Sequence, residues 1–138
     1  MKVSVIYAST TGNTEAMANA INEAVTSAGA EAIFGTADSA DAGSAAASDV
    51  ILLGSPAMGD EVLEDTMEEF YTGIEGALSG KKVGLFGSYD WGDGQWLRDW
   101  EDRARNAGAD VSESLMVHLT PEADDLAKCQ DWAKAFLA

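Results

Sequence analysis

Short apolar runs alternate along the chain with stretches in which apolar residues recur every three or four positions. The runs are typical of strands, and the recurring positions are typical of one buried face of a helix. Two runs, 50–54 and 83–87, are apolar throughout, as expected for strands covered on both faces of a parallel sheet. The predicted strands are residues 3–7, 32–34, 50–54, 83–87 and 115–119. The predicted helices are residues 12–28, about 66–78, 97–107 and a last segment that begins at about residue 121.

Glycines and polar caps predict where these helices begin and end. Thr66 and Glu69 have the spacing of a capping box, which places the start of that helix at Thr66. Thr120 and Pro121 are N-cap and first-turn signals for the last helix. Residues 36–48 are small and polar and predict a thin crossover with at most a short helix. The three long helices before the last one are each expected to end at a glycine, namely Gly29, Gly80 and Gly108.

Five alternating strands and helices predict an α/β fold in one domain, residues 1–138. The expected architecture is a doubly wound five-stranded parallel sheet in the order 2-1-3-4-5, with helices on both faces. Strands one, three and four are neighbours in that order. Because ligands bind beyond the carboxyl ends of such strands, the three loops that follow them are expected to meet at one site.

Net charge and cysteine content limit which classes of partner and which cellular compartment are expected. The formal net charge is −16, from 24 acidic and 8 basic residues. This balance argues against nucleic acid and membrane surfaces and favours basic partners, although it is also explained by solubility alone. Cys129 is the only cysteine, which fits a reducing cytoplasm and a buried structural thiol. No signal peptide or membrane span is expected.

The first of the three loops carries the strongest chemical signal. It is rich in hydroxyl groups and opens a helix, whose first N–H groups and dipole favour an anion. It contains no Lys or Arg, and the nucleotide-binding glycine motifs are absent, so a single phosphate monoester is expected rather than a triphosphate. An ordinary helix-capping turn is the alternative explanation. The loop consists of Ser9, Thr10, Thr11, Gly12, Asn13 and Thr14.

The second and third loops add groups suited to a flat ligand. Trp91 lies between Asp90 and Gly92, where helical periodicity does not account for a large aromatic residue. It either packs over the core or forms a platform for a planar ring. Met58 offers a thioether that suits the face of a ring. Together the loops predict a ring system tethered to one phosphate.

The chain resembles the flavodoxin family at all three loops. The stretch 5–18 matches that family's phosphate loop, and 57–64 and 85–93 are similar to the two flavin-contacting loops of its short-chain, clostridial-type members. The resemblance covers essentially the whole chain and implies a flavodoxin-like three-layer sandwich with non-covalently bound FMN. It implies that Ser9 to Thr14 hold the phosphate and that Met58 and Trp91 flank the ring. The remaining contacts it implies are Ser55, Pro56 and Ala57 near the ribityl chain, and Gly59, Asp60, Glu61, Ser88, Tyr89, Asp90, Gly92 and Asp93 around the ring.

The resemblance also implies a mechanism. The Gly59 carbonyl is expected to accept a hydrogen bond from the N5–H of the flavin semiquinone. The acidic residues nearby are expected to disfavour the fully reduced anion. Four positions depart from the pattern of the clostridial relatives: Ala8, Thr10, Pro56 and Asp90. Asp90 replaces a common glycine, which is unfavourable if the backbone there has positive φ, and Pro56 replaces a hydroxyl residue.

The expected function is therefore low-potential, one-electron transfer through the semiquinone/hydroquinone couple of FMN, without catalysis and without a metal. The expected partners are redox proteins with basic patches, such as reductases, other oxidoreductases, hydrogenase-like enzymes and enzymes that use ferredoxin, and the chain is expected to be a monomer.

The alternative is an FMN-dependent NAD(P)H or quinone reductase, which Trp91 should obstruct. A response-regulator receiver is excluded because strand three ends in Gly54 and Ser55 rather than an aspartate. A low-molecular-weight phosphatase is excluded because the first loop has no Cys or Arg. His118 is expected to be solvated or part of the core rather than a proton relay.

Overall fold

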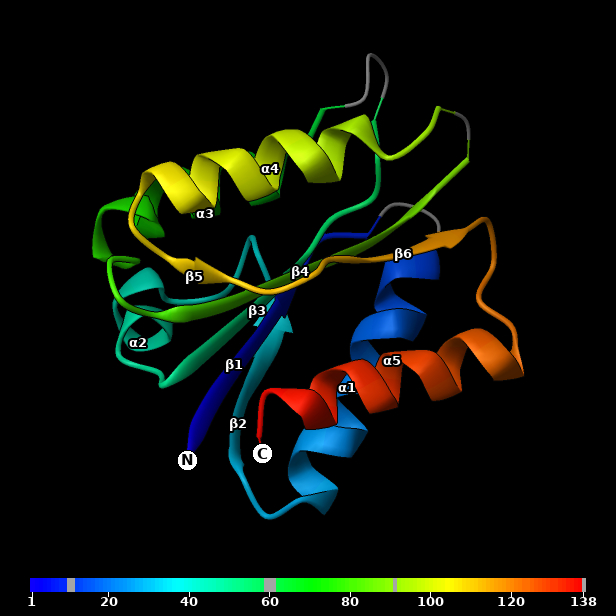
Figure 1. Cartoon of the computed structure of the whole chain (residues 1–138), viewed down its shortest axis with the longest axis horizontal. Coiled ribbons are helices and arrows are strands. Elements are labelled where there is room, and N and C mark those ends of the chain that lie inside the picture. The colour runs from blue at the N-terminus through cyan, green and yellow to red at the C-terminus, as the bar shows by residue number, and fades with distance from the viewer. Residues whose placement is uncertain (10–11, 59–61, 91, 138) are drawn as a thin grey trace.

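A parallel β-sheet with helices on both faces forms the centre of the molecule (Figure 1). The structure is a computed structural model and describes residues 1–9, 12–58, 62–90 and 92–137. The strands are β1 (Lys2–Tyr7), β2 (Glu31–Thr36), β3 (Val50–Gly54), β4 (Lys82–Tyr89), β5 (Asp110–Val111) and β6 (Leu115–His118). They pair in the order β2-β1-β3-β4-β5, and β6 also pairs with β4. The predicted order 2-1-3-4-5 is thus confirmed.

The fifth position of the sheet is occupied by two short strands rather than one. Asp110 and Val111 pair with Lys82 and Val83, and further along β4 the strand β6 pairs with residues 86–89. The prediction of a single strand over 115–119 missed β5, since two residues are too few to form a pattern. It also extended β6 by one residue, because Leu119 leaves the extended conformation with φ 62°.

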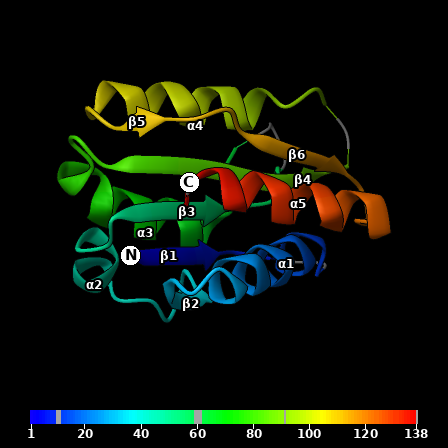
Figure 2. The ribbon, with the colours of Figure 1, turned by 60° about the horizontal axis from the view of Figure 1, so that its bottom comes forward.

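The helices form two layers, one on each face of the sheet (Figures 1 and 2). Helices α1 (Asn13–Ser27) and α5 (Ala123–Ala135) cover one face, and α2 (Ala42–Ala46), α3 (Asp65–Ile74) and α4 (Gln95–Asn106) cover the other. The side chains of β3 alternate between the two resulting cores, which is why its sequence is apolar throughout. Ile51 and Leu53 pack with α3 and α4, whereas Val50 and Leu52 pack with α1 and α5.

Two predicted helix starts are wrong, and in each a carboxylate is the true cap. Helix α3 begins one residue before Thr66, because the Glu64 carboxylate accepts hydrogen bonds from the Thr66 N–H (3.1 Å) and hydroxyl. Helix α5 begins after Pro121, at a capping box formed by Glu122 and Asp125. In both cases the negative charge lies at the positive end of the helix dipole, where it is most favourable.

The other helix boundaries agree more closely with the sequence. Helix α1 ends just before Gly29, α4 ends just before Gly108, and the crossover contains only the short α2. Helix α3 ends earlier than predicted, at Ile74, and continues as the 3-10 turn Glu75–Ala77 (η2) before Gly80. Within the described ranges, no helix combines the length and apolar character needed to cross a bilayer.

Candidate functional site

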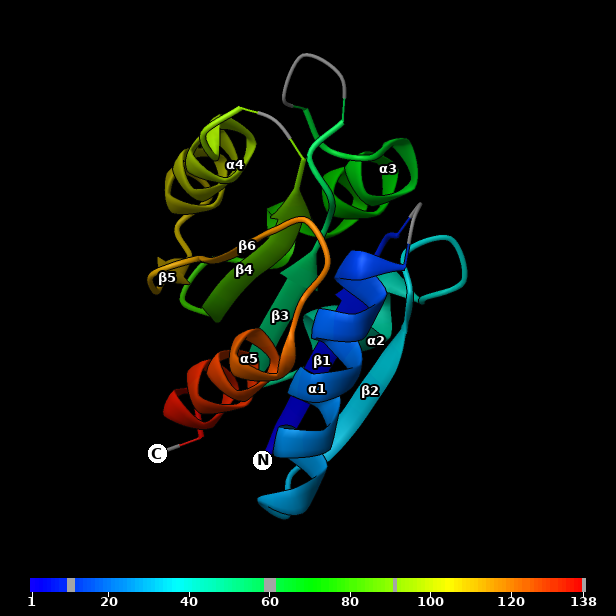
Figure 3. The same ribbon diagram turned by 90° about the vertical axis from the view of Figure 1, so that its right-hand side faces the viewer.

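The carboxyl ends of β1, β3 and β4 lie side by side at one edge of the sheet (Figure 3). Tyr7 on β1 is in register with Gly54 on β3, which in turn is in register with Phe86 on β4. The three loops singled out from the sequence therefore leave from the same edge. This register brings together residues that are far apart in the chain.

The first loop is capped from within. The Ser9 Oγ accepts hydrogen bonds from the backbone N–H groups of Gly12 (3.0 Å) and Glu15 (3.4 Å). Gly12 has φ 92°, a conformation that favours glycine, and among the described residues no atom beyond its chain neighbours lies within 4 Å of the place where a Cβ would stand. Ser9 therefore closes this turn, whereas Gly12, the N-cap residue of α1, makes no side-chain cap of its own.

Ser88, at the end of β4, joins the first loop to the other two. Its hydroxyl oxygen lies 3.2 Å from that of Thr14, with which it shares a hydrogen bond, and both side chains are buried. The Ser88 carbonyl accepts a hydrogen bond from the Ala57 N–H (3.1 Å) in the second loop. Thr14, Ala57 and Ser88 therefore tie all three loops together through neutral groups.

The second loop is held at its base by Ser55. The buried Ser55 hydroxyl donates to the Pro56 carbonyl (3.0 Å) and accepts from the Glu64 N–H (3.0 Å). The Ser55 carbonyl accepts a hydrogen bond from the Trp96 Nε1–H (3.1 Å), which reaches it from α4. Further along, the Met58 N–H donates to the Val62 carbonyl (3.0 Å) and so closes the loop.

Asp90, Gly92 and Asp93 of the third loop are exposed, and the loop is anchored on both sides. The Arg98 guanidinium bonds the carboxylate and the carbonyl of Asp93, both at 2.9 Å. The His118 Nε2 lies 2.9 Å from the Asp90 carbonyl oxygen. Asp90 does not have positive φ, which falls instead at Gly92 (φ 88°). The expected cost of an aspartate at this position is therefore absent.

Comparison with known proteins identifies the family. The family model for flavodoxin matches residues 5–132. The chain is 46% identical to a flavodoxin of Megasphaera elsdenii, over 96% of each chain, and 42% identical to one of Clostridium beijerinckii, over 86% of this chain and 87% of that one. The solution structure of two-electron reduced Megasphaera elsdenii flavodoxin superposes with a TM-score of 0.86 at 44% identity, covering 96% of this chain and 98% of that one.

The chain belongs to the flavodoxin family. Flavodoxins bind FMN and carry electrons rather than acting as enzymes, which confirms the fold, the cofactor and the function expected from the sequence. The reductase alternative is not favoured. An electron carrier implies redox proteins as its partners.

The described part of the site fits a flavodoxin cofactor. An FMN phosphate needs hydrogen-bond donors, and the backbone N–H groups at the first turn of α1 are of that kind. Met58 lies in the second loop and its side chain is half-buried. Six predicted site residues lie outside the described residues: Thr10, Thr11, Gly59, Asp60, Glu61 and Trp91.

Three residues that anchor this flavodoxin site were not foreseen: Trp96, Arg98 and His118. Trp96 is buried but was not assigned to the inner face of α4, although its place between polar residues and Leu97 could have suggested a core position. The other two bond to backbone carbonyls of the third loop, and no local pattern in the sequence reveals such partners.

The described part of the site includes the carboxylates of Glu15, Asp90 and Asp93. The Tyr7 hydroxyl, below the first loop, donates a hydrogen bond to the Glu15 carboxylate (3.1 Å). Burial raises the pKa of Tyr7, and the Glu15 carboxylate raises it further, so the hydroxyl stays protonated and can go on donating. Asp90 and Asp93 are both exposed, so water screens their effect on the site.

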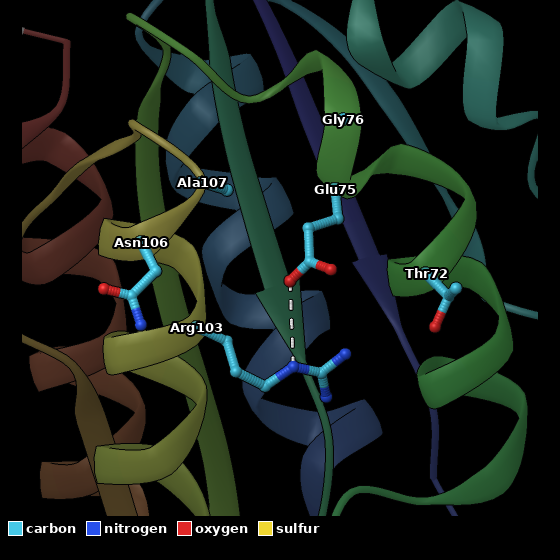
Figure 4. A pocket seen from close by; sticks show the side chains of 6 residues that line it. All are labelled: Thr72, Glu75, Gly76, Arg103, Asn106 and Ala107. Atoms are coloured by element: carbon cyan, nitrogen blue, oxygen red, sulfur yellow. Dashed lines mark ion pairs between the residues drawn. The ribbon is translucent and has the colours of Figure 1, made fainter.

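A separate hollow of about 550 Å³ lies between α3, η2 and α4 (Figure 4). Arg103 from α4 points toward Glu75, with its Nε 3.7 Å from the carboxylate. It also forms two hydrogen bonds to Glu68 (2.7 and 2.9 Å) and lies 4.7 Å above the Tyr71 ring. Arg103 thus links the two helices that follow the second and third loops.

Proposed function

We propose that the chain is a low-potential, one-electron carrier whose FMN lies across the three loops. In this proposal the phosphate binds at Ser9 to Thr14, and the ribityl chain runs past Ser55, Pro56 and Ala57. Met58 and Trp91 flank the ring, and the backbone and side chains of residues 59–61, 88–90, 92 and 93 surround its polar edge. The observation that carries the proposal is the direct bonding of Ser88 to both Thr14 and Ala57.

The residues of the site have distinct tasks in this proposal. Bound FMN supplies the electron-transfer chemistry, which no side chain of the site offers. The Gly59 carbonyl would accept a hydrogen bond from the N5–H of bound flavin, and such a bond contributes about 1 kcal/mol. Met58 and Trp91 exclude water from the faces of the ring. The nearby carboxylates make added negative charge costly, so an electron is given up readily.

The acidic surface directs the carrier to a basic face of a redox protein. With a net charge of −16, association should be fast at low salt and should slow as ionic strength rises and the screening length falls below about 10 Å. The chain acts as a monomer in the cytoplasm, in line with its single, buried cysteine. Electron-transfer rates to a basic partner that do not respond to salt would leave solubility as the only role of the charge.

Titration of the apoprotein with FMN and with riboflavin tests where the phosphate binds. The substitution Thr14→Val keeps the side-chain shape and removes the hydroxyl, and it should weaken FMN binding by roughly tenfold or more, because a bond to a charged group is lost. Riboflavin lacks the phosphate, so its affinity should fall only by the smaller part that reflects the lost bond between Thr14 and Ser88. Thr26→Val, at the other end of α1, is the matched control. Equal losses for both ligands would contradict a phosphate site at Thr14.

A further inference from the structure

The pairing of β6 with β4 ends at the base of the third loop. His118 is the last residue of β6 and is in register with Tyr89, the last residue of β4. The Leu119 N–H still donates to the Tyr89 carbonyl (2.8 Å), but Leu119 has φ 62° and turns the chain away from the sheet. Beyond Tyr89, the backbone of this segment therefore no longer runs alongside β4.

The His118 side chain supplies the next hydrogen bond in place of the backbone. Its Nε2 lies 2.9 Å from the Asp90 carbonyl oxygen, one residue beyond the end of the ladder. Its ring packs against the Tyr89 ring, with centroids 4.9 Å apart. Tyr89 in turn packs on Trp96 (5.8 Å), whose indole N–H holds the Ser55 carbonyl of the second loop. His118 is thus the outer end of a chain of contacts that spans two loops.

The Asp90 carbonyl also determines which ring nitrogen of His118 must carry a hydrogen. A carbonyl oxygen only accepts hydrogen bonds, so Nε2 must carry a hydrogen. Both the neutral Nε2–H tautomer and the imidazolium meet this requirement, whereas the neutral Nδ1–H tautomer does not. The bond therefore persists whether the ring is neutral or charged.

We propose that His118 is a positioning residue for the flavin site: it holds the Asp90 carbonyl and so sets where the third loop leaves the sheet. This inference rests on the proposed function, in which that loop contacts the ring. His118 itself lies outside the predicted contacts with FMN. Its effect on the cofactor is transmitted through Tyr89 and Asp90.

Two substitutions separate the hydrogen bond from the bulk of the side chain. His118→Gln retains an N–H donor at similar reach, whereas His118→Leu has none. We expect His118→Leu to weaken FMN binding about fivefold, the ratio that corresponds to one net hydrogen bond. His118→Gln should restore the affinity to within about twofold of the unsubstituted chain. Thr120→Val, an exposed position two residues further on, is the matched control and should bind FMN normally.

Three readouts distinguish positioning from a general effect on stability. FMN fluorescence gives the affinity, visible circular dichroism of bound FMN reports the surroundings of the ring, and thermal unfolding of the apoprotein reports the fold. We expect His118→Leu to change the first two and leave the third unchanged. Equal affinities and spectra for the Leu and Gln variants would overturn the positioning role while leaving the proposed function intact.

The ring protonation provides an independent test on the unsubstituted chain. Nitrogen NMR of the single histidine should show a hydrogen on Nε2 in the neutral form. A neutral ring protonated on Nδ1 would overturn the inference, whatever the affinities are. If the unsubstituted chain took up no FMN, the proposed function would fall and this inference with it.

Discussion

Gly87 is the position at which a single added methyl group should damage the site most directly. A Cβ built on Gly87 would lie 2.0 Å from the Ser55 carbonyl oxygen and 3.0 Å from the Trp96 ring. The first contact is with backbone, which cannot turn aside as a flexible side chain can. In Gly87→Ala, β3 and β4 must therefore move apart where the second and third loops begin.

The size of the effect follows from the contacts at this point. Overpacking of a well-packed interior costs about 1–3 kcal/mol. Displacing the Ser55 carbonyl also breaks its buried bond from the Trp96 indole N–H, for which about 1–3 kcal/mol is typical when a partner is left unsatisfied. We therefore expect Gly87→Ala to lower the free energy of unfolding by about 3 kcal/mol. That is a large share of the stability of a domain of this size.

Urea unfolding of the apoprotein measures this change, with Gly35→Ala as the matched control. Gly35 also lies in a strand, β2, but apart from its chain neighbours no atom of the described residues lies within 4 Å of the point that a Cβ on this residue would occupy. The substitution should therefore raise stability slightly, by about 0.4–1 kcal/mol. Gly87→Ala should also weaken FMN binding, because Ser55 and Ser88 move. An unchanged urea midpoint for Gly87→Ala would refute the argument from close packing.

Three further predictions concern single groups elsewhere in the fold. Hydrogen bonding from Arg103 lowers the pKa of Glu68, so the stability this pair contributes is present above the unfolded-state pKa and is lost as pH falls through the folded-state value. Urea titrations from pH 6 to 3 should show Glu68→Gln losing this dependence, by less than about 1 kcal/mol because both side chains are partly exposed. Burial raises the pKa of Cys129 to about 12, so the native thiol should resist alkylation at pH 8 and react once the chain is unfolded in urea. Leu119→Asn should raise the unfolding temperature of the apoprotein, since asparagine tolerates positive φ and a leucine there costs about 1–2 kcal/mol.

The sheet and its layers could be predicted from the sequence because neighbouring residues determine them. The run at 50–54 is apolar because alternate side chains enter two different cores, and this pattern is visible without any knowledge of the partners. The same holds for the apolar face of α3, where Met67, Phe70 and Ile74 are all buried. The position of the three loops then follows from the strand order, without reference to any single contact.

The features that could not be predicted depend on partners distant in the sequence. The Trp96 indole N–H bonds the carbonyl of Ser55, which lies 41 positions earlier in the chain. The His118 side chain bonds the Asp90 carbonyl in place of the backbone, because the chain turns away from the sheet at Leu119. The start of α3 was missed for a different, local reason, since two neighbouring residues could each cap the helix. The Glu64 carboxylate is favoured over the Thr66 hydroxyl because it brings charge as well as an acceptor.

The way the loops are joined suits an acidic chain that binds an anionic cofactor. Ser88 bonds to Thr14 and to Ala57 through hydroxyl and peptide groups, so no charged side chain is needed to assemble the edge of the sheet. The nearby Arg98 is already paired with Asp93, and Arg103 is paired with Glu68 between α3 and α4. These two cations thus serve to hold helices and loops in place. We propose that neutral donors meet the phosphate, and that the carboxylates around the site shape both the potential and the choice of partner.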